Sequence, residues 1–363
     1  MKELGISIYP DKTSEEEIIN YIEKASECGF SRIFSCLLSI NDTKENIISK
    51  FKKINTYAKE KGFTVILDVS PRVFDELGIN YKDLTFFKET NCDGIRLDMG
   101  FSGLEESIMT FNPQNLKIEI NMSNNTSYVD TIMDYMPNKN NLIACHNFYP
   151  HRFSGLDTEY FNECTSRFNK YGLRTAAFIT SQNNDTFGPW PVTDKLPTLE
   201  IHRDLELSTQ IKHFIALGNI DDLIISNCYP TADELESIKT LKKDRVIFDI
   251  EIEKTTSEIE RKILLEELHF NRGDISKKLI RSTQSRVKYK GTNFKIHNPK
   301  DIKRGDIIIE SSEYGHYAGE LQIALVDMKN SGKSNVVGRI KEEEIFILDN
   351  IKAWQKFGFR EII

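Results

Sequence analysis

The sequence of 363 residues contains no apolar run that approaches the roughly 18 residues of a membrane-spanning helix. No apolar leader follows Met1, so we expect a cytoplasmic protein without a membrane partner. Positive charge is also scarce, because 48 Lys and Arg stand against 55 Asp and Glu, for a net charge of −7. This balance argues against a general nucleic-acid binder, since neutralising phosphates requires clustered cations. A small anionic substrate is not excluded, because it needs only a few local cations.

Cysteine is sparse and scattered. The six cysteines form no CxxC pair, so we expect reduced, mostly buried residues rather than a disulfide framework. No HxH or HExxH spacing is present, and we predict neither a metal nor a cofactor. A metal held by His and carboxylates of neighbouring strands is the weaker alternative. No nucleophile elbow is present either, which argues against an activated serine.

Strand and helix patterns alternate through the first two thirds of the chain. Ser14 and Glu17 have the spacing of a capping box, and Gly29 and Gly62 are placed to end helices. Eight strands separated by helices predict a (β/α)8 barrel over residues 1–243. An open doubly wound sheet is the alternative, but no glycine-rich phosphate loop follows the first strand. The predicted strands are residues 4–10, 32–38, 64–69, 94–99, 117–122, 142–147, 174–179 and 222–227.

The pattern changes near residue 244. One helical segment precedes several short apolar runs that are separated by turns, which predicts a small all-β domain, a closed barrel, over residues 244–363. The helix is predicted over residues 257–269, and the strands over 278–282, 306–310, 320–325, 335–340 and 346–348.

Three successive strands of the predicted barrel end in carboxylates, namely Asp68, Asp98 and Glu119. The carboxyl ends of barrel strands meet at one mouth, so we expect these groups to lie close together. Two carboxyl groups at one site are the equipment of acid–base or glycosyl-transfer chemistry. A single such residue more often caps the next helix, but three in succession favour a catalytic site.

Further polar groups are expected to bind a substrate. Arg96 shares a face with Asp98, and it is expected to hold one carboxylate ionised while another stays protonated. His146 is equally well explained as a hydrogen-bonded core residue. Glu200 follows a long loop, residues 182–197, which contains Trp190; it faces the mouth or belongs to a helix start capped by Thr198. The remaining candidates at the mouth are Tyr9, Asn121, Asn147, Tyr149 and Asn227.

The second domain adds a cluster of cations and hydroxyls. Arg281 and Ser282 lie in a segment with two Arg and three hydroxyl residues, which suits an anion such as phosphate. An exposed strand with solvated charges is an equally good interpretation. Tyr314 begins a polar and aromatic run that is also expected to reach the substrate.

Several motifs, in the same order along the whole chain, resemble the bacterial 6-phospho-N-acetylmuramidase family. They are Gly5-Ile6-Ser7-Ile8-Tyr9-Pro10, Gly29-Phe30-Ser31-Arg32-Ile33-Phe34, Leu67-Asp68-Val69, Arg96-Leu97-Asp98, Glu119-Ile120-Asn121, His146-Asn147-Phe148-Tyr149-Pro150, Pro197-Thr198-Leu199-Glu200 with His202-Arg203, and Gly319-Glu320-Leu321-Gln322. The resemblance implies a barrel followed by a cyclophilin-like β-barrel. It also implies a cytoplasmic enzyme of peptidoglycan recycling.

The substrate that the resemblance implies is the β-1,4-linked disaccharide of N-acetylmuramic acid 6-phosphate and N-acetylglucosamine. Its hydrolysis gives the two sugars. On this basis we predict Glu119 as the acid and Asp98 as its partner, with Asp68 as the third carboxylate, and we expect Arg281 and Ser282 to hold the 6-phosphate. A retaining, an inverting and a substrate-assisted mechanism are all left open. A homo-oligomer is one alternative for the assembly.

Two other classes of protein fit the same barrel. A phosphosugar isomerase or aldolase is the first, although an aldolase requires a lysine at a strand end for a Schiff base, and none is found there. A non-catalytic carbohydrate-binding protein is the second, and it tolerates loss of the strand-end carboxylates. A glycoside hydrolase accounts best for three carboxylates in succession.

Overall fold

The computed structural model describes residues 3–37 and 42–362 of the chain, so Leu38, the predicted end of the second strand, lies outside the described residues. The chain divides into two compact units, residues 1–211 with 219–240 and residues 212–218 with 241–363. Within the described ranges, no helix has both the length and the apolar character needed to cross a bilayer. None of the six cysteines, which all lie in the described ranges, forms a disulfide, and all except Cys28 are buried.

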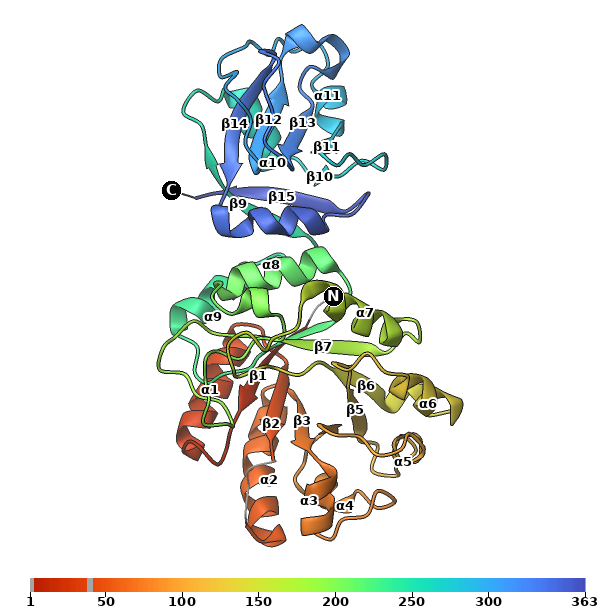
Figure 1. Cartoon of the computed structure of the whole chain (residues 1–363). Helices are drawn as coiled ribbons and strands as arrows, with labels where there is room; N and C mark the ends of the chain where they lie inside the picture. The colour runs from red at the N-terminus through yellow and green to blue at the C-terminus, as the bar shows by residue number, and fades with distance from the viewer. Residues whose placement is uncertain (1–2, 38–41, 363) are drawn as a thin grey trace. The chain divides into compact units, whose positions relative to one another are not determined.

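The first unit contains a closed parallel barrel in which eight strands pair in chain order. Figure 1 shows strands of this barrel with α1 (Glu15–Glu27), α2 (Lys44–Glu60) and α7 (Thr158–Asn169) outside them. The predicted barrel is therefore confirmed and the open sheet is excluded. The strands are β1 (Glu3–Ile8), β2 (Arg32–Cys36), β3 (Thr64–Val69), β4 (Gly94–Leu97), β5 (Lys117–Asn121), β6 (Leu142–Cys145), β7 (Arg174–Ile179) and β8 (Asp222–Ile225).

The helices of this unit begin and end where the sequence signals place them. Ser14 forms the predicted capping box with Glu17 at the start of α1. Gly29 and Gly62 follow the ends of α1 and α2 with φ of 80° and 88°, a conformation that glycine adopts without steric cost. The helical segments are α1 (Glu15–Glu27), α2 (Lys44–Glu60), α3 (Pro71–Glu76), α4 (Thr85–Glu89), α5 (Leu104–Met109), α6 (Tyr128–Asp134), η1 (Lys139–Asn141), α7 (Thr158–Asn169), η2 (Glu200–His202), α8 (Leu207–Leu217) and α9 (Ala232–Lys239). Residues 212–217 of α8 are assigned to the second unit.

Strand register explains why charged residues meet inside the barrel. Asp68 pairs with Arg96 across β3 and β4, and Arg96 pairs with Glu119 across β4 and β5. Side chains at paired positions of parallel strands lie on the same face of the sheet. Apolar side chains also pack inside the barrel; for example, Phe34 and Phe178 meet edge to face with ring centroids 5.1 Å apart.

The second unit contains one mixed sheet of seven strands in the order β10-β15-β9-β14-β12-β13-β11. The N–H of Arg272 donates to the carbonyl of Arg281 at 3.0 Å, which brings the two edge strands together and nearly closes the sheet. The cyclophilin-like classification stays a prediction. The elements are β9 (Val246–Ile252), α10 (Glu258–Glu266), β10 (His269–Phe270), β11 (Leu279–Ser282), α11 (Gln284–Lys288), β12 (Asp306–Glu310), η3 (Ser312–Tyr317), β13 (Leu321–Ala324), β14 (Ser334–Ile340), η4 (Glu342–Asn350) and β15 (Lys356–Glu361).

One predicted strand of this unit is wrong. Residues 346–348 belong to the helical segment η4 and not to a strand. Ile347 and Leu348 are buried, so the run is apolar because one side of a short helix packs into the core. A short apolar run does not by itself distinguish a buried strand from a buried helix.

Candidate active site

The side chain of Arg96 is the centre of a charged group at the carboxyl ends of the barrel strands. Its Nη1 atom lies 2.5 Å from Asp68 Oδ1 and 3.2 Å from Asp98 Oδ1. Its Nη2 atom donates to the side-chain oxygen of Asn147. We call Asp68, Arg96, Asp98 and Asn147 the mouth cluster. The structure therefore brings together two of the three predicted catalytic carboxylates, with the predicted arginine between them.

The two carboxylates of the mouth cluster differ in their exposure to solvent. The side chain of Asp68 is 6% exposed, whereas that of Asp98 is 37% exposed. Burial raises the pKa of Asp68 to about 7, against the opposing effect of Arg96 and with a further contribution from Asp98. Asp68 thus keeps its proton up to about pH 7, well above the range of an ordinary aspartate, which is the property that a general acid requires.

Two adjoining cavities open on the mouth cluster, and both are lined by Asp98 and Asn147. The smaller, of about 190 Å³, is also lined by Asp68, Arg96 and Trp190, and we call it the Trp190 cavity. The larger, of about 490 Å³, is called the Tyr128 cavity. Its lining includes Met99, Phe101, Asn121, Asn124, Thr126 and Tyr128. Two cavities that share a carboxylate provide room for two adjacent sugar rings.

A buried carboxylate supports the wall of the Tyr128 cavity. Glu106 is fully buried at the start of α5, and it accepts hydrogen bonds from the Tyr128 hydroxyl, from Phe101 N–H and, at 2.7 Å, from Gly103 N–H. A Cβ atom on Gly100 would lie only 1.9 Å from the Tyr128 hydroxyl. Glycine is therefore required at position 100 for this tyrosine to take its place in the wall.

Glu119, the predicted acid, lies in a different group. It is fully buried and pairs with Arg32, whose Nη1 atom lies 2.5 Å from Asp222 Oδ2. Arg32 and Asp222 begin β2 and β8, so we call Arg32, Glu119 and Asp222 the floor cluster. Glu119 lines neither the Trp190 cavity nor the Tyr128 cavity. Its role as the acid stays a prediction that this geometry does not favour.

Three predicted substrate ligands are fully buried in the barrel core. Tyr9 donates its hydroxyl proton to the Ser226 carbonyl. His146 contacts the hydroxyls of Ser123 and Thr165, at 3.2 and 2.9 Å, and burial together with Arg96 lowers its pKa to about 3. The side chain of Asn227 accepts a hydrogen bond from the N–H of Ser181 and donates one to the carbonyl of the same residue. These contacts are those of structural residues that support the loops.

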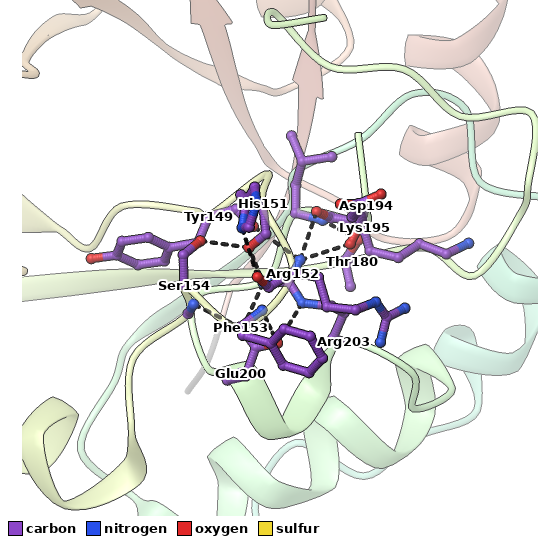
Figure 2. Close-up of polar contacts among 12 residues, drawn as sticks. Tyr149, His151, Arg152, Phe153, Ser154, Thr180, Asp194, Lys195, Glu200 and Arg203 are labelled. Carbon is purple, nitrogen blue, oxygen red and sulfur yellow. Dashed lines mark hydrogen bonds and ion pairs between the residues drawn. The ribbon is translucent and has the colours of Figure 1, made fainter. Parts of the chain in front are cut away.

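Glu200 and Arg203 hold two loops of the barrel together, as Figure 2 shows. Arg203 is 1% exposed, and its guanidinium donates to four carbonyls, those of Tyr149, His151, Asp194 and Lys195. Its Nη2 atom also lies 2.6 Å from Glu200 Oε2. Arg203 lowers the pKa of Glu200 to about 2, with help from the N–H groups of Phe153 and Gly155. Glu200 therefore organises the loops that carry Asn147 and Trp190.

Tyr149 lies in one of these loops, and Asn121 is the last residue of β5. Tyr149 is partly buried, and its N–H donates to the Pro197 carbonyl at 3.0 Å. Asn121 lines the Tyr128 cavity, and its amide donates to the Asp98 carbonyl at 3.1 Å. Of the two candidates on β5, Asn121 contacts the mouth cluster and Glu119 belongs to the floor cluster.

The candidates in the second unit have partners of their own. Arg281 Nε lies 2.8 Å from Glu320 Oε1, and its side chain is 21% exposed. The buried Ser282 hydroxyl contacts His269 Nδ1 at 2.9 Å. The Tyr314 hydroxyl donates to Ser331 Oγ at 2.9 Å. A role of Arg281 and Ser282 in holding phosphate stays a prediction.

Sequence reasoning missed most of the Tyr128 cavity. Met99 and Phe101 follow Asp98 closely, Asn124 and Thr126 lie in the turn after β5, and Tyr128 begins α6. The position of these residues in the chain could have identified them, because loops that follow the carboxyl ends of barrel strands form the active site in such enzymes. The polar run from Ser123 to Ser127 carries this signal.

The chemistry available at the mouth follows from these contacts. Asp68 supplies a proton, and Asp98 supplies a more exposed carboxylate beside the same guanidinium. No group of three or more His, Cys, Asp or Glu able to hold a metal occurs in the part of the chain that the structure describes. This arrangement is suited to proton transfer to the oxygen that links two rings. The second carboxylate then lies next to the carbon at which the bond breaks.

Comparison with known proteins gives two family matches. A family model described as 6-phospho-N-acetylmuramidase, N-terminal, matches residues 4–240, and its C-terminal counterpart matches residues 246–360. The chain is similar to an uncharacterized B. cereus protein of known structure, with 44% identity, a TM-score of 0.91, and coverage of 99% of this chain and 100% of that one. No curated protein matches.

A more distant structure shares the fold. The chain is similar to a conserved protein of unknown function from Enterococcus faecalis, with 23% identity and a TM-score of 0.69 over 99% of this chain and 96% of that one. At this identity the likeness concerns the fold alone.

Proposed function

The chain belongs to the 6-phospho-N-acetylmuramidase family of glycosidases, and from that premise we propose that it hydrolyses the β-1,4 bond between N-acetylmuramic acid 6-phosphate and N-acetylglucosamine. The proposed substrate is a peptidoglycan fragment, so the proposed process is peptidoglycan recycling in the cytoplasm. The observation that carries the proposal is the mouth cluster, in which Asp68, whose pKa is raised to about 7, and Asp98 share Arg96 beside two adjoining cavities.

Asp68 is the proposed general acid. It transfers its proton to the glycosidic oxygen as the bond from that oxygen to the anomeric carbon breaks, and the electron pair leaves with the N-acetylglucosamine oxygen. The positive charge that develops at the anomeric carbon is stabilised by Asp98. A water molecule then adds to that carbon and returns a proton to Asp68.

The spacing of the carboxylates supports retention at the anomeric carbon. Asp68 Oδ1 and Asp98 Oδ1 contact the same nitrogen of Arg96, at 2.5 and 3.2 Å. These oxygens are therefore closer than the roughly 6.5–9.5 Å that leaves room for a water molecule in inverting glycosidases. In the first step, either Asp98 or the acetamido oxygen of the substrate bonds to the anomeric carbon as the leaving oxygen departs. The water molecule that gives its proton to Asp68 then displaces this oxygen from the carbon, so both routes invert the carbon twice and lead to retention.

Arg281 is the proposed ligand of the 6-phosphate. Its guanidinium is partly exposed beside Glu320, and a second arginine, Arg286, lies 2.8 Å from the other oxygen of that carboxylate. Two arginines around one carboxylate leave a net positive charge for an anion. Arg281→Ala should reduce the preference for phosphorylated over plain disaccharide at least tenfold; an unchanged preference would remove this assignment.

The test of the proposed function is a mass-spectrometric assay on the phosphorylated disaccharide beside its unphosphorylated twin. We expect release of N-acetylglucosamine from the phosphorylated form alone. Proton NMR at early times should then show the β-anomer of N-acetylmuramic acid 6-phosphate. Cleavage of neither disaccharide by folded protein would contradict the proposal.

A further inference from the structure

The Tyr128 cavity has a lining of amides, a hydroxyl and aromatic rings. Asn121, Asn124 and Thr126 supply the polar groups, and Phe101 and Tyr128 supply the rings. None of the described residues that line this cavity is a lysine, an arginine or a histidine. Such a surface is suited to the hydroxyls, the acetamido group and the apolar face of a neutral sugar.

Two carboxylates give this cavity a negative environment. Asp98 lines it directly, at the border with the Trp190 cavity. Glu106 lies behind its wall and accepts three hydrogen bonds, from the N–H groups of Phe101 and Gly103 and from the Tyr128 hydroxyl. Because Glu106 is fully buried, solvent screens its charge poorly, so an anionic sugar would be repelled here.

The Trp190 cavity differs in its charges. Arg96 lines it, and so does Asp68, whose pKa burial raises to about 7. Near neutral pH the mouth cluster therefore presents to this cavity one arginine, a partly protonated Asp68 and the carboxylate of Asp98. This side of the site tolerates a negatively charged ring better than the Tyr128 cavity does.

We propose, on the basis of the proposed function, that the Tyr128 cavity is the site of the neutral leaving sugar and that its lining determines specificity against anionic leaving groups. The phosphorylated sugar, which also carries a lactyl carboxylate, lies on the Trp190 side. The bond that is cleaved crosses the border at Asp98 and Asn147, which line both cavities.

Asn124 and Thr126 are the residues through which this specificity can be changed. Both are exposed and line the cavity. Between them, Asn125 attaches the turn to α7, because its amide donates to Glu163 Oε2 at 3.0 Å and its side-chain oxygen accepts from Arg167 Nε. The turn is held in place by Asn125, so a substitution at position 124 or 126 changes the lining without removing this attachment.

The experiment compares two substrates, the phosphorylated disaccharide and the same disaccharide with a carboxylate in place of the C6 hydroxymethyl group of the leaving sugar. We expect kcat/KM to be at least tenfold higher for the neutral leaving sugar. Thr126→Lys should narrow this ratio at least fivefold, and Asn124→Lys should act in the same direction. Thr240→Lys, which makes the same charge change at an exposed helix end, should leave the ratio unchanged.

The outcomes separate this proposal from the proposed function. Equal cleavage of both substrates, or a ratio that both lysine variants leave unchanged, overturns the assignment of the leaving sugar while the hydrolase stands. Failure of the parent protein to cleave either substrate contradicts the proposed function itself. A ratio that narrows equally in Thr240→Lys shows a general charge effect and also overturns the assignment.

Discussion

The barrel holds two arginine–carboxylate clusters of similar composition in different surroundings. In the mouth cluster, Arg96 lies between Asp68 and Asp98, and the group lines two cavities. In the floor cluster, Arg32 lies between Glu119 and Asp222, whose side chains are 0% and 1% exposed. The two clusters have similar side chains, and they differ in whether a substrate can reach them.

The pairing within each cluster also differs. In the floor cluster, Asp222 binds a second arginine, Arg174, through both of its carboxylate oxygens at 2.9 Å, so its charge is well compensated. In the mouth cluster one arginine serves two carboxylates, and burial raises the pKa of Asp68 although Arg96 opposes this shift. Incomplete compensation of charge is a common property of catalytic groups, because it prepares one of them to transfer a proton.

The largest effect should come from Asp68→Asn. Loss of a general acid lowers rates by about 10²–10⁴-fold, and we expect kcat/KM to fall within this range. The matched control is Asp75→Asn, which removes an exposed carboxylate of α3. Rates on the phosphorylated disaccharide, with circular dichroism to check folding, make the measurement. A well-folded Asp68→Asn protein of normal activity would show that the mouth cluster has no proton donor at this position.

Glu119→Gln should instead reduce stability. Removing this charge leaves Arg32 less compensated in the core, and breaking a buried ion pair typically costs about 3–5 kcal/mol in the free energy of unfolding. Because Arg32 keeps Asp222, we expect the lower end of this range. Urea unfolding of this variant, beside Glu89→Gln at an exposed position of α4, makes the comparison. Unchanged stability would mean that Glu119 has no structural role.

The pH dependence of kcat/KM should follow the proton on Asp68. Its pKa is raised to about 7, so the carboxyl group is protonated below this pH and loses its proton above it. An acid must be protonated to act, and kcat/KM should therefore fall about tenfold per pH unit above pH 7. Rates between pH 5 and 9 test this. A profile that stays level to pH 9 would contradict Asp68 as the donor.

A smaller effect is expected for Trp190→Ala. Trp190 is 42% exposed and lines the cavity that receives the phosphorylated sugar in our proposal. Loss of its ring should raise KM about tenfold, equivalent to about 1.4 kcal/mol, with a smaller change in kcat. Phe111→Ala, at an exposed aromatic residue after α5, is the control. Equal KM values for the two variants would show that Trp190 does not contribute to substrate binding.

The fold of the first unit was predictable because its signals are local. Periodicity identified all eight barrel strands in order, and capping residues such as Ser14 and Gly29 marked the helix ends. The second unit was predictable only in part. β9, β10 and β15 were missed, and residues 346–348 were wrongly predicted as a strand, since burial in η4 gives them the same apolar pattern.

The site was predictable only as a set of candidates. The end of a strand indicated that Asp68, Arg96 and Asp98 reach the mouth, and the structure places them together. The same rule selected Glu119, but the partner that places it in the floor cluster, Arg32, is 87 residues away in the chain. Distant pairing of this kind decides which carboxylate is accessible, and no local pattern reports it.

The most direct test of the account is the rate of Asp68→Asn and Glu119→Gln on the phosphorylated disaccharide, each divided by its folded fraction and followed by mass spectrometry. We predict that Asp68→Asn loses at least 100-fold relative to the parent protein. Glu119→Gln, once corrected for folding, should stay within about threefold, because its carboxylate lines neither cavity. The opposite order, with a nearly inactive folded Glu119→Gln protein and an active Asp68→Asn protein, would contradict the assignment of catalysis to the mouth cluster.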